Sequence, residues 1–134
     1  MKKLKVILVD NDQDEIEFMQ EGFHSSGLFD VVGQATNGED LIERILRSGH
    51  PLPDVIVSDL NMPGKNGLDI LHAVRNNALW AHVKVIILST SSAQSFVSQC
   101  MKAGADLYLT KPPTFLEYEG FARGLYHQIS PEAS

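Results

Sequence analysis

The chain has 134 residues, of which 43% are hydrophobic and 21% charged, a composition typical of one globular domain rather than a disordered segment. Its net charge of −6 argues against a nucleic-acid or anionic-membrane surface, and its single cysteine excludes an intrachain disulfide and a cysteine-based metal cluster. No apolar run reaches the ~20 residues of a membrane span, and the first run is too short for a signal peptide, so we expect a cytoplasmic protein.

Five short apolar runs alternate with five segments of helical periodicity. The runs are rich in Val, Ile and Leu and do not clearly alternate with polar residues, which is typical of parallel strands covered on both faces. They span residues 6–9, 31–35, 55–58, 85–88 and 107–109. The helical stripes expected to face the core begin at Ile16, Leu41, Leu68, Phe96 and Tyr118. The pattern predicts an α/β fold, a doubly wound five-stranded parallel sheet over residues 1–129, with a C-terminal tail at 130–134.

Polar side chains follow four of the five predicted strands. They are Asp10, Asn11 and Asp12 after the first strand, Asp59 after the third, Ser89 after the fourth and Lys111 after the fifth. In an open parallel sheet, ligands bind beyond the carboxyl ends of the strands. We therefore expect carboxylates, a hydroxyl and an ammonium group to meet at one edge of the sheet.

The residue types at this edge indicate phosphoryl transfer to a carboxylate. Oxygen ligands without His or Cys suit a hard cation, and Mg²⁺ commonly bridges carboxylates to a phosphate. A carboxylate held beside such a cation and a lysine can attack phosphorus and form an aspartyl phosphate. Asp59 is the preferred nucleophile because it stands alone on its strand, whereas the Asp10 cluster can hold the metal.

Each residue also has a structural interpretation. An Asp just after a strand is often the N-cap of the next helix, which applies to Asp10 and Asp12. A lysine after a strand usually faces solvent, and the serines and threonine at 89–92 could form a loop and a helix cap. The functional interpretation depends on the joint occurrence at four strand ends.

At these residues the sequence resembles the receiver domains of two-component response regulators, the CheY-like family. The motifs that carry the resemblance lie at residues 6–12, 54–64 with Gly67, 85–89 and 104–112, within a match over about residues 4–129. Ser89 follows Asp59 by 30 residues and Lys111 follows Ser89 by 22, and both intervals fit the family pattern. The resemblance implies a flavodoxin-like sheet with strand order 2-1-3-4-5.

The resemblance also implies a role for each matching residue. Asp59 would accept a phosphoryl group, Lys111 and Ser89 would contact phosphoryl oxygens, and Lys111 would precede a cis bond to Pro112. Ser89 and Tyr108 would form the switch. Mg²⁺ would be held by Asp10, by Asp59 and by the backbone carbonyl of Asn61, with the residue at position 11 as a further ligand.

The implied function is a stand-alone signalling switch rather than a turnover enzyme, with self-catalysed phosphotransfer and autodephosphorylation. The phosphodonor would be a histidine kinase, a phosphotransfer protein or a small phosphodonor. The output would be a changed surface on the helix near Phe96, the strand at residues 107–109 and the last helix, read by an unidentified protein. Homodimers are compatible with this fold, whereas nucleic-acid and membrane partners are not expected.

Asn11 departs from the family pattern, which has a second acid as a direct metal ligand at this position. A neutral amide should weaken Mg²⁺ binding, although Asp12 could substitute in part. The alternative function is therefore a pseudo-receiver, a phosphorylation-independent binding module. A phosphatase that acts through Asp59 would need a second acid two residues later, where Asn61 stands.

Several other residues have two interpretations. Glu15, Glu17 and Glu21 are interpreted as a solvated helix face that could also select a basic kinase surface. Trp80 is either a partner anchor or a packing residue. We expect Cys100 in the core, and Tyr118, Phe121 and Tyr126 in the core or at an interface.

Overall fold

The computed structural model describes residues 2–47, 51–91 and 93–130, and these contain one five-stranded sheet. Its order is β2-β1-β3-β4-β5, with every neighbouring pair parallel, so the predicted fold class and strand order are confirmed. The strands are β1 (Leu4–Val9), β2 (Phe29–Ala35), β3 (Val55–Asp59), β4 (Lys84–Ser89) and β5 (Leu107–Thr110).

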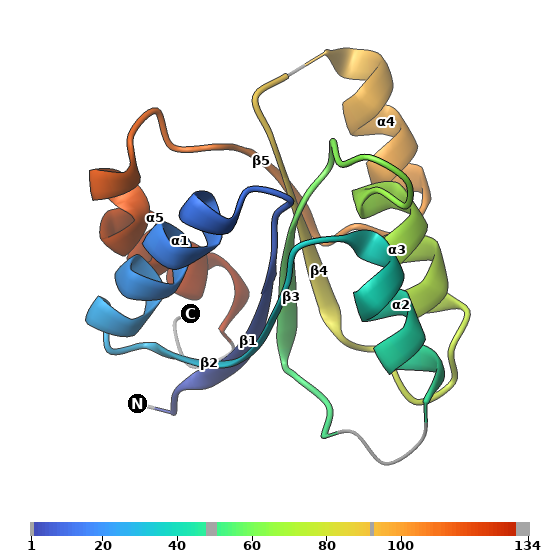
Figure 1. Ribbon diagram of the computed structural model, residues 1–134, viewed down its shortest axis with the longest axis horizontal. Coiled ribbons are helices and arrows are strands. Elements are labelled where there is room, and N and C mark those ends of the chain that lie inside the picture. The colour runs from blue at the N-terminus through green and yellow to red at the C-terminus, as the bar shows by residue number, and fades with distance from the viewer. Residues whose placement is uncertain (1, 48–50, 92, 131–134) are drawn as a thin grey trace.

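Helices cover both faces of this sheet. Figure 1 shows α1 and α5 on one face and α2, α3 and α4 on the other. The helices are α1 (Gln13–Ser25), α2 (Gly38–Leu46), α3 (Gly67–Arg75), α4 (Gln94–Lys102) and α5 (Tyr118–Ile129), with a 3₁₀ turn η1 (Phe115–Glu117) just before α5. The loops that leave the carboxyl ends of β1, β3, β4 and β5 therefore all lie at the upper end of Figure 1.

The two faces of the sheet support two separate hydrophobic clusters. Val6 and Leu8 of β1 pack with α1 and α5, whereas Ile7 and Val9 pack with α2 and α3. Successive side chains of a strand point to opposite faces, so one strand supplies both clusters. The central strands are buried on both sides, as their continuous apolar runs predict.

The edge strand β2 differs from that prediction. Its side chains alternate, with Phe29 and Ala35 buried and Asp30, Val32 and Gln34 exposed. Among the described residues, β2 pairs with β1 alone and forms the edge of the sheet. Residues 29 and 30 also belong to the strand, although Asp30 interrupts the apolar run.

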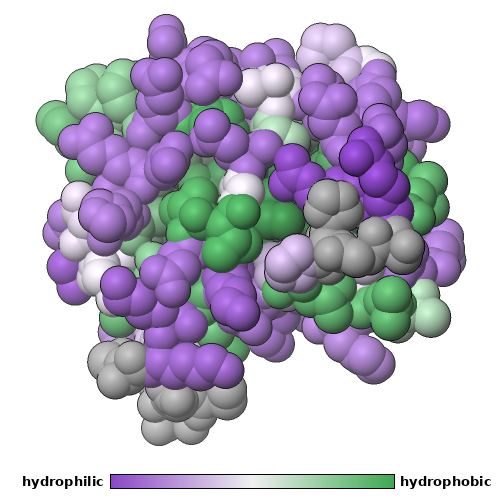
Figure 2. All heavy atoms as spheres, turned by 60° about the horizontal axis from the view of Figure 1, so that its bottom comes forward, coloured by the Kyte–Doolittle hydropathy of each residue, from purple (hydrophilic) through white to green (hydrophobic). Residues whose placement is uncertain are grey.

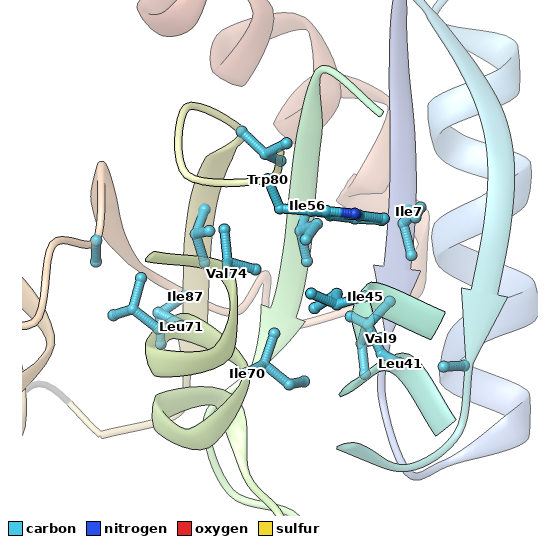
Figure 3. Packing of buried hydrophobic residues seen from close by; sticks show 14 of the residues in the cluster. Ile7, Val9, Leu41, Ile45, Ile56, Ile70, Leu71, Val74, Trp80 and Ile87 are labelled. Atoms are coloured by element: carbon cyan, nitrogen blue, oxygen red, sulfur yellow. The ribbon is translucent and has the colours of Figure 1, made fainter. Parts of the chain in front are cut away.

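Trp80 is a packing residue. Its side chain is only 2% exposed and belongs to the cluster between the sheet and α2 and α3. Figure 3 shows the indole extending across Ile56 toward Ile7. Cys100, Tyr118 and Tyr126 are also buried, as expected, while Phe121 is partly buried.

The stripe predicted for α4 is largely outside the core. Among the described residues of α4, Cys100 alone is buried. Phe96 and Met101 are 41% and 45% exposed. Leu46 of α2 is exposed as well. Helical periodicity identifies the apolar residues of a helix but does not say how deeply the neighbouring elements cover them.

The surface at the amino ends of the strands is mostly polar (Figure 2). Figure 2 shows the face that carries the amino ends of the strands as largely hydrophilic, with hydrophobic residues gathered near its middle. Within the described ranges, no helix is long and apolar enough to cross a membrane. The tail expected from residue 130 begins with a buried Ser130, whose N–H caps α5 on the carbonyl of Tyr126, whereas 131–134 lie outside the described residues.

Candidate phosphorylation site at the carboxyl edge of the sheet

Three of the predicted site residues converge where β1, β3 and β5 end. Asp10 follows β1, Asp59 is the last residue of β3, and Lys111 follows β5. The Lys111 Nζ lies 2.7 Å from Asp10 Oδ2 and 3.4 Å from Asp59 Oδ2. The structure therefore brings together two carboxylates, separated by 49 residues in sequence, around one ammonium group.

Burial sets the electrostatics of this cluster. Asp10 is 1% exposed and Asp59 7%. Burial raises the pKa of Asp59, the Lys111 charge opposes this, and the neighbouring Asp10 carboxylate raises the pKa further. Burial would lower the pKa of Lys111, but the hydrogen bond to Asp10 and the charge of Asp59 outweigh it and the net pKa is raised. Lys111 therefore stays protonated. Beside it, burial makes the ionised form of the Asp59 carboxylate less favourable than it is in water.

The backbone after β3 wraps closely around Asp59. The Asn61 N–H donates a hydrogen bond to Asp59 Oδ1 over 3.4 Å, and the Gly67 N–H donates to the Leu60 carbonyl. A Cβ on Gly67 would lie 2.7 Å from the backbone oxygen of Asp59. Glycine at position 67 therefore allows the first turn of α3 to pack directly against the strand end that carries Asp59.

Ser89 and Tyr108 are linked through Ser91. Ser89 is buried at the end of β4, and its Oγ accepts a hydrogen bond from the Ser91 N–H at 3.0 Å. The partly buried Tyr108 donates its hydroxyl to the Ser91 carbonyl at 2.7 Å. One backbone unit thus connects the hydroxyl at the site edge to the aromatic residue on β5.

The acidic run after β1 divides between two environments. Asp12 is exposed and caps α1, since its side chain accepts hydrogen bonds from the Asp14 and Glu15 N–H groups, as its structural interpretation predicts. Asn11 is also exposed. Within residues 2–47, 51–91 and 93–130, no group of three or more His, Cys, Asp or Glu side chains is arranged to hold a metal ion.

The peptide bond between Lys111 and Pro112 differs from the expectation. The described part of the chain contains no cis peptide bond, so this bond is trans. A trans bond is the favoured form before proline by about 0.5–1 kcal/mol.

Sequence reasoning missed one participant at the edge of the site. Glu15, expected on a solvated face with Glu17 and Glu21, is half-buried and accepts a hydrogen bond from the buried Tyr118 hydroxyl. Glu15 also lines a cleft of about 440 Å³ together with Asp10, Asp12, Lys111 and the two prolines that follow it. No sequence signal links the two partners, because they are 103 residues apart and only the packing of α1 on α5 brings them together.

Comparisons with known proteins find similarity over most of the chain. A family model described as "Response regulator receiver domain" matches residues 6–117. The chain is 36% identical over 118 residues to the nitrate/nitrite response regulator protein homolog of Haemophilus influenzae, covering 86% of this chain and 54% of that protein. The chain therefore spans about half the length of this curated relative.

Solved structures show the same fold. The signal receiver domain of the putative response regulator NarL from Mycobacterium tuberculosis is similar with a TM-score of 0.76 and 28% identity, over 93% of this chain and 97% of that one. The phosphorylated cyanobacterial phytochrome response regulator RcpA has a TM-score of 0.82 and 23% identity, over 98% of this chain and 97% of that one. The Mn(2+)-bound form of response regulator Rcp1 has a TM-score of 0.74 and 22% identity, over 92% of this chain and 91% of that one. The last two likenesses, below 25% identity, concern the fold alone.

Proposed function

This chain belongs to the family of response regulator receiver domains, which are signalling domains, and we propose that it accepts a phosphoryl group on Asp59. The observation that carries the proposal is the cluster of Asp10, Asp59 and Lys111 at the carboxyl edge of the sheet. The Asp59 carboxylate is buried, and the Lys111 ammonium group beside it can neutralise charge on an arriving phosphoryl group.

The proposed reaction transfers the phosphoryl group from a phosphohistidine of a histidine kinase or phosphotransfer protein. An Asp59 carboxylate oxygen attacks the phosphorus as the bond from phosphorus to the imidazole nitrogen breaks. The nitrogen keeps the electron pair of that bond and takes a proton from water. Lys111 neutralises charge on the phosphoryl oxygens, so most of the protein's contribution is positioning and electrostatic stabilisation.

The donor set fits a hard divalent cation such as Mg²⁺, although incompletely. Asp10 and Asp59 supply carboxylates, the Asn61 carbonyl a neutral oxygen, and Asn11 or Asp12 a further ligand. When bound, Mg²⁺ would offset the repulsion between the two carboxylates and the phosphoryl oxygens. A response regulator with the same fold, Rcp1, has a Mn(2+)-bound form, which supports a divalent site in a sheet of this kind.

Ser89 and Tyr108 form the proposed switch. The Ser89 oxygen already accepts the Ser91 N–H, which leaves its own proton to donate to a phosphoryl oxygen. A shift of Ser89 toward Asp59 would move Ser91 and with it the carbonyl that holds Tyr108. The result would be an altered surface of α4, β5 and α5, where Phe96 and Met101 are already exposed for contact with a target protein.

Attack of water on the phosphorus of the aspartyl phosphate would end the signal. That step releases inorganic phosphate and returns the Asp59 carboxylate. The domain would thereby return to its unphosphorylated state by itself, as a signalling switch rather than a turnover enzyme.

A pseudo-receiver is the second candidate function. The observation that favours it is the exposed amide of Asn11 in place of an acid, together with the lack of a three-acid metal cluster in the described ranges. In that case the fold would bind its partner without phosphorylation.

The test is intact-protein mass spectrometry after incubation with a small phosphodonor, with and without Mg²⁺. We expect the wild type to gain one phosphoryl group in the presence of Mg²⁺ and Asp59→Asn to gain none. Asp30→Asn, an exposed acid on the edge strand, is the matched control and should be labelled like the wild type. Absence of labelling, even with a histidine kinase as donor, would overturn the proposal in favour of the pseudo-receiver.

A further inference from the structure

A carboxylate outside the proposed phosphorylation cluster, in the cleft that Asp10 and Lys111 also line, accepts a hydrogen bond from a buried phenol. Tyr118, the first residue of α5, is fully buried, and its hydroxyl donates a hydrogen bond to Glu15 in the first turn of α1. Burial, together with the Glu15 carboxylate, raises the pKa of Tyr118, so the phenol stays protonated and remains a donor at neutral pH. The hydrogen bond thus holds the Glu15 carboxylate in one place.

The position of Glu15 distinguishes it from the other acids of α1. Glu15 is half-buried and lines the cleft that also contains Asp10 and Lys111, whereas Asp14 and Glu17 are exposed. The Glu15 charge is one of those that raise the pKa of Lys111. Among the described residues, however, the ion pairs of Lys111 within 4.0 Å involve Asp10 and Asp59 and do not include Glu15.

We propose that Glu15, positioned by the Tyr118 hydroxyl, is a donor-selectivity residue that disfavours small, highly charged phosphodonors. The inference rests on the proposed function of Asp59 as phosphoacceptor. Glu15 and Lys111 line the same cleft, so a free phosphodonor that approaches Lys111 brings its full negative charge near the Glu15 carboxylate. A phosphohistidine on a protein partner can arrive with basic side chains beside it that offset the same repulsion.

The Glu15 charge reduces the attraction that Lys111 exerts on an incoming anion. Asp10 and Asp59 already place two carboxylates near its ammonium group. The Glu15 carboxylate adds a third negative charge in the same cleft, which lowers the local potential seen by an incoming anion, and the Tyr118 hydrogen bond keeps it there. The penalty grows with the charge of the donor and falls as salt screens it.

The experiment compares two small donors, acetyl phosphate as a dianion and phosphoramidate as a species with a single net negative charge. The measured quantity is the ratio of the two Asp59 phosphorylation rate constants at saturating Mg²⁺, at low and at high salt. Glu15→Gln should raise the acetyl phosphate rate about threefold to tenfold at low salt, with a smaller gain for phosphoramidate. High salt should shrink this difference, and Glu17→Gln, on the exposed side of α1, should leave the ratio unchanged.

A second variant tests the positioning role of Tyr118. Tyr118→Phe keeps the buried ring and removes the hydrogen bond, so Glu15 can turn into solvent and the donor ratio should move toward that of Glu15→Gln. In the Glu15→Gln background, Tyr118→Phe should leave the ratio where it is. A ratio that Glu15→Gln does not change, in a protein that both donors label, would overturn the inference. If neither small donor nor a histidine kinase labels the wild type, the proposed function itself fails.

Discussion

At the scale of single residues, the proposed phosphoacceptor Asp59 carries a cost in stability. Its carboxylate is 7% exposed, and burial raises its pKa in spite of the nearby Lys111. The folded protein therefore holds a proton on Asp59 more tightly than the unfolded chain does. Stability consequently falls as the pH rises from the ordinary value of 3.8 through the folded-state pKa, and it stays lower above that pKa.

Asp59→Asn should therefore stabilise the protein at neutral pH in the absence of divalent ions. The amide has no charge to desolvate, so we expect a melting temperature higher by about 2–6 °C, the size of a change of roughly 1 kcal/mol in a chain of this length. Thermal unfolding in the presence of a chelator, measured at several pH values, gives the comparison. The gain should shrink as the pH falls toward 3.8, and a gain that is independent of pH would contradict the assignment to the Asp59 charge.

Asn11 is the residue at which the site departs most from the family pattern. Asn11→Asp adds a full negative charge beside Asp10, and we expect Mg²⁺ to bind about tenfold more tightly to this variant than to the wild type. Titration calorimetry measures the affinity directly. Asp14→Asn is exposed on the first turn of α1 and lies outside the cleft, so it should have little effect. An unchanged affinity in Asn11→Asp would show that position 11 does not contribute to the site.

At the scale of elements, the packing of α1 on α5 depends on one glycine. A Cβ on Gly22 would lie 2.5 Å from the Tyr118 Cβ and 2.8 Å from the Glu119 backbone nitrogen. Backbone atoms cannot yield as a flexible side chain can, so the two helices would have to separate. The same packing carries the hydrogen bond between Tyr118 and Glu15.

Gly22→Ala should therefore destabilise the protein, by about 1–3 kcal/mol. The matched control is Gly120→Ala in α5, where a Cβ would meet nothing within 4 Å and the helix should gain about 0.5–1 kcal/mol. Chemical denaturation of both variants gives the two free energies of unfolding. Equal effects of the two substitutions would contradict the close approach of α1 and α5.

The segment η1 presents apolar side chains next to α1 and α5. Phe115 stacks on Phe18 of α1 with ring centroids 4.1 Å apart, yet it is 51% exposed, and Leu116 is 79% exposed. Glu21 and Glu119 line the same cleft as these residues. Exposed apolar residues with an acidic border are typical of a surface that contacts a protein with basic side chains.

Leu116→Ser should slow phosphotransfer from a protein donor about fivefold without changing the rate with a small donor. Because Leu116 is so exposed, the free energy of unfolding should change by less than about 0.5 kcal/mol. Leu79→Ser, at a site 69% exposed in the turn between α3 and β4, is the control and should leave both rates unchanged. A rate with the small donor that falls as much as the rate with the protein donor would argue against a docking role.

At the scale of the whole molecule, the pattern of apolar residues predicts the fold, because helices on both faces of the sheet require strands that are apolar on both sides. The apolar runs of β1, β3 and β4 are buried on both faces, so they indicate a covered parallel sheet. The convergence of Asp10, Asp59 and Lys111 follows from the same topology, since parallel strands bring their carboxyl ends to one edge. Apolar periodicity places strand ends one or two residues short where polar residues such as Asp30 and Lys84 begin or interrupt the strand.

Contacts between distant side chains could not be predicted in this way. Arg75 donates hydrogen bonds to the Gly104 carbonyl and to Asp106, and Tyr118 to Glu15, each across elements far apart in sequence. The depth of Trp80 and the exposure of Phe96 likewise depend on how helices and loops pack rather than on their own periodicity. Periodicity gives the face of an element, whereas the tertiary contacts decide what covers that face.

The most direct test of the account is the location of the phosphoryl group. Borohydride reduces an aspartyl phosphate to homoserine, and peptide mass mapping then identifies the modified residue. After incubation with a phosphodonor and Mg²⁺, the account predicts homoserine at position 59 and at no other aspartate. Homoserine at Asp10 or Asp12, or at no aspartate under conditions in which a control receiver is labelled, would contradict it.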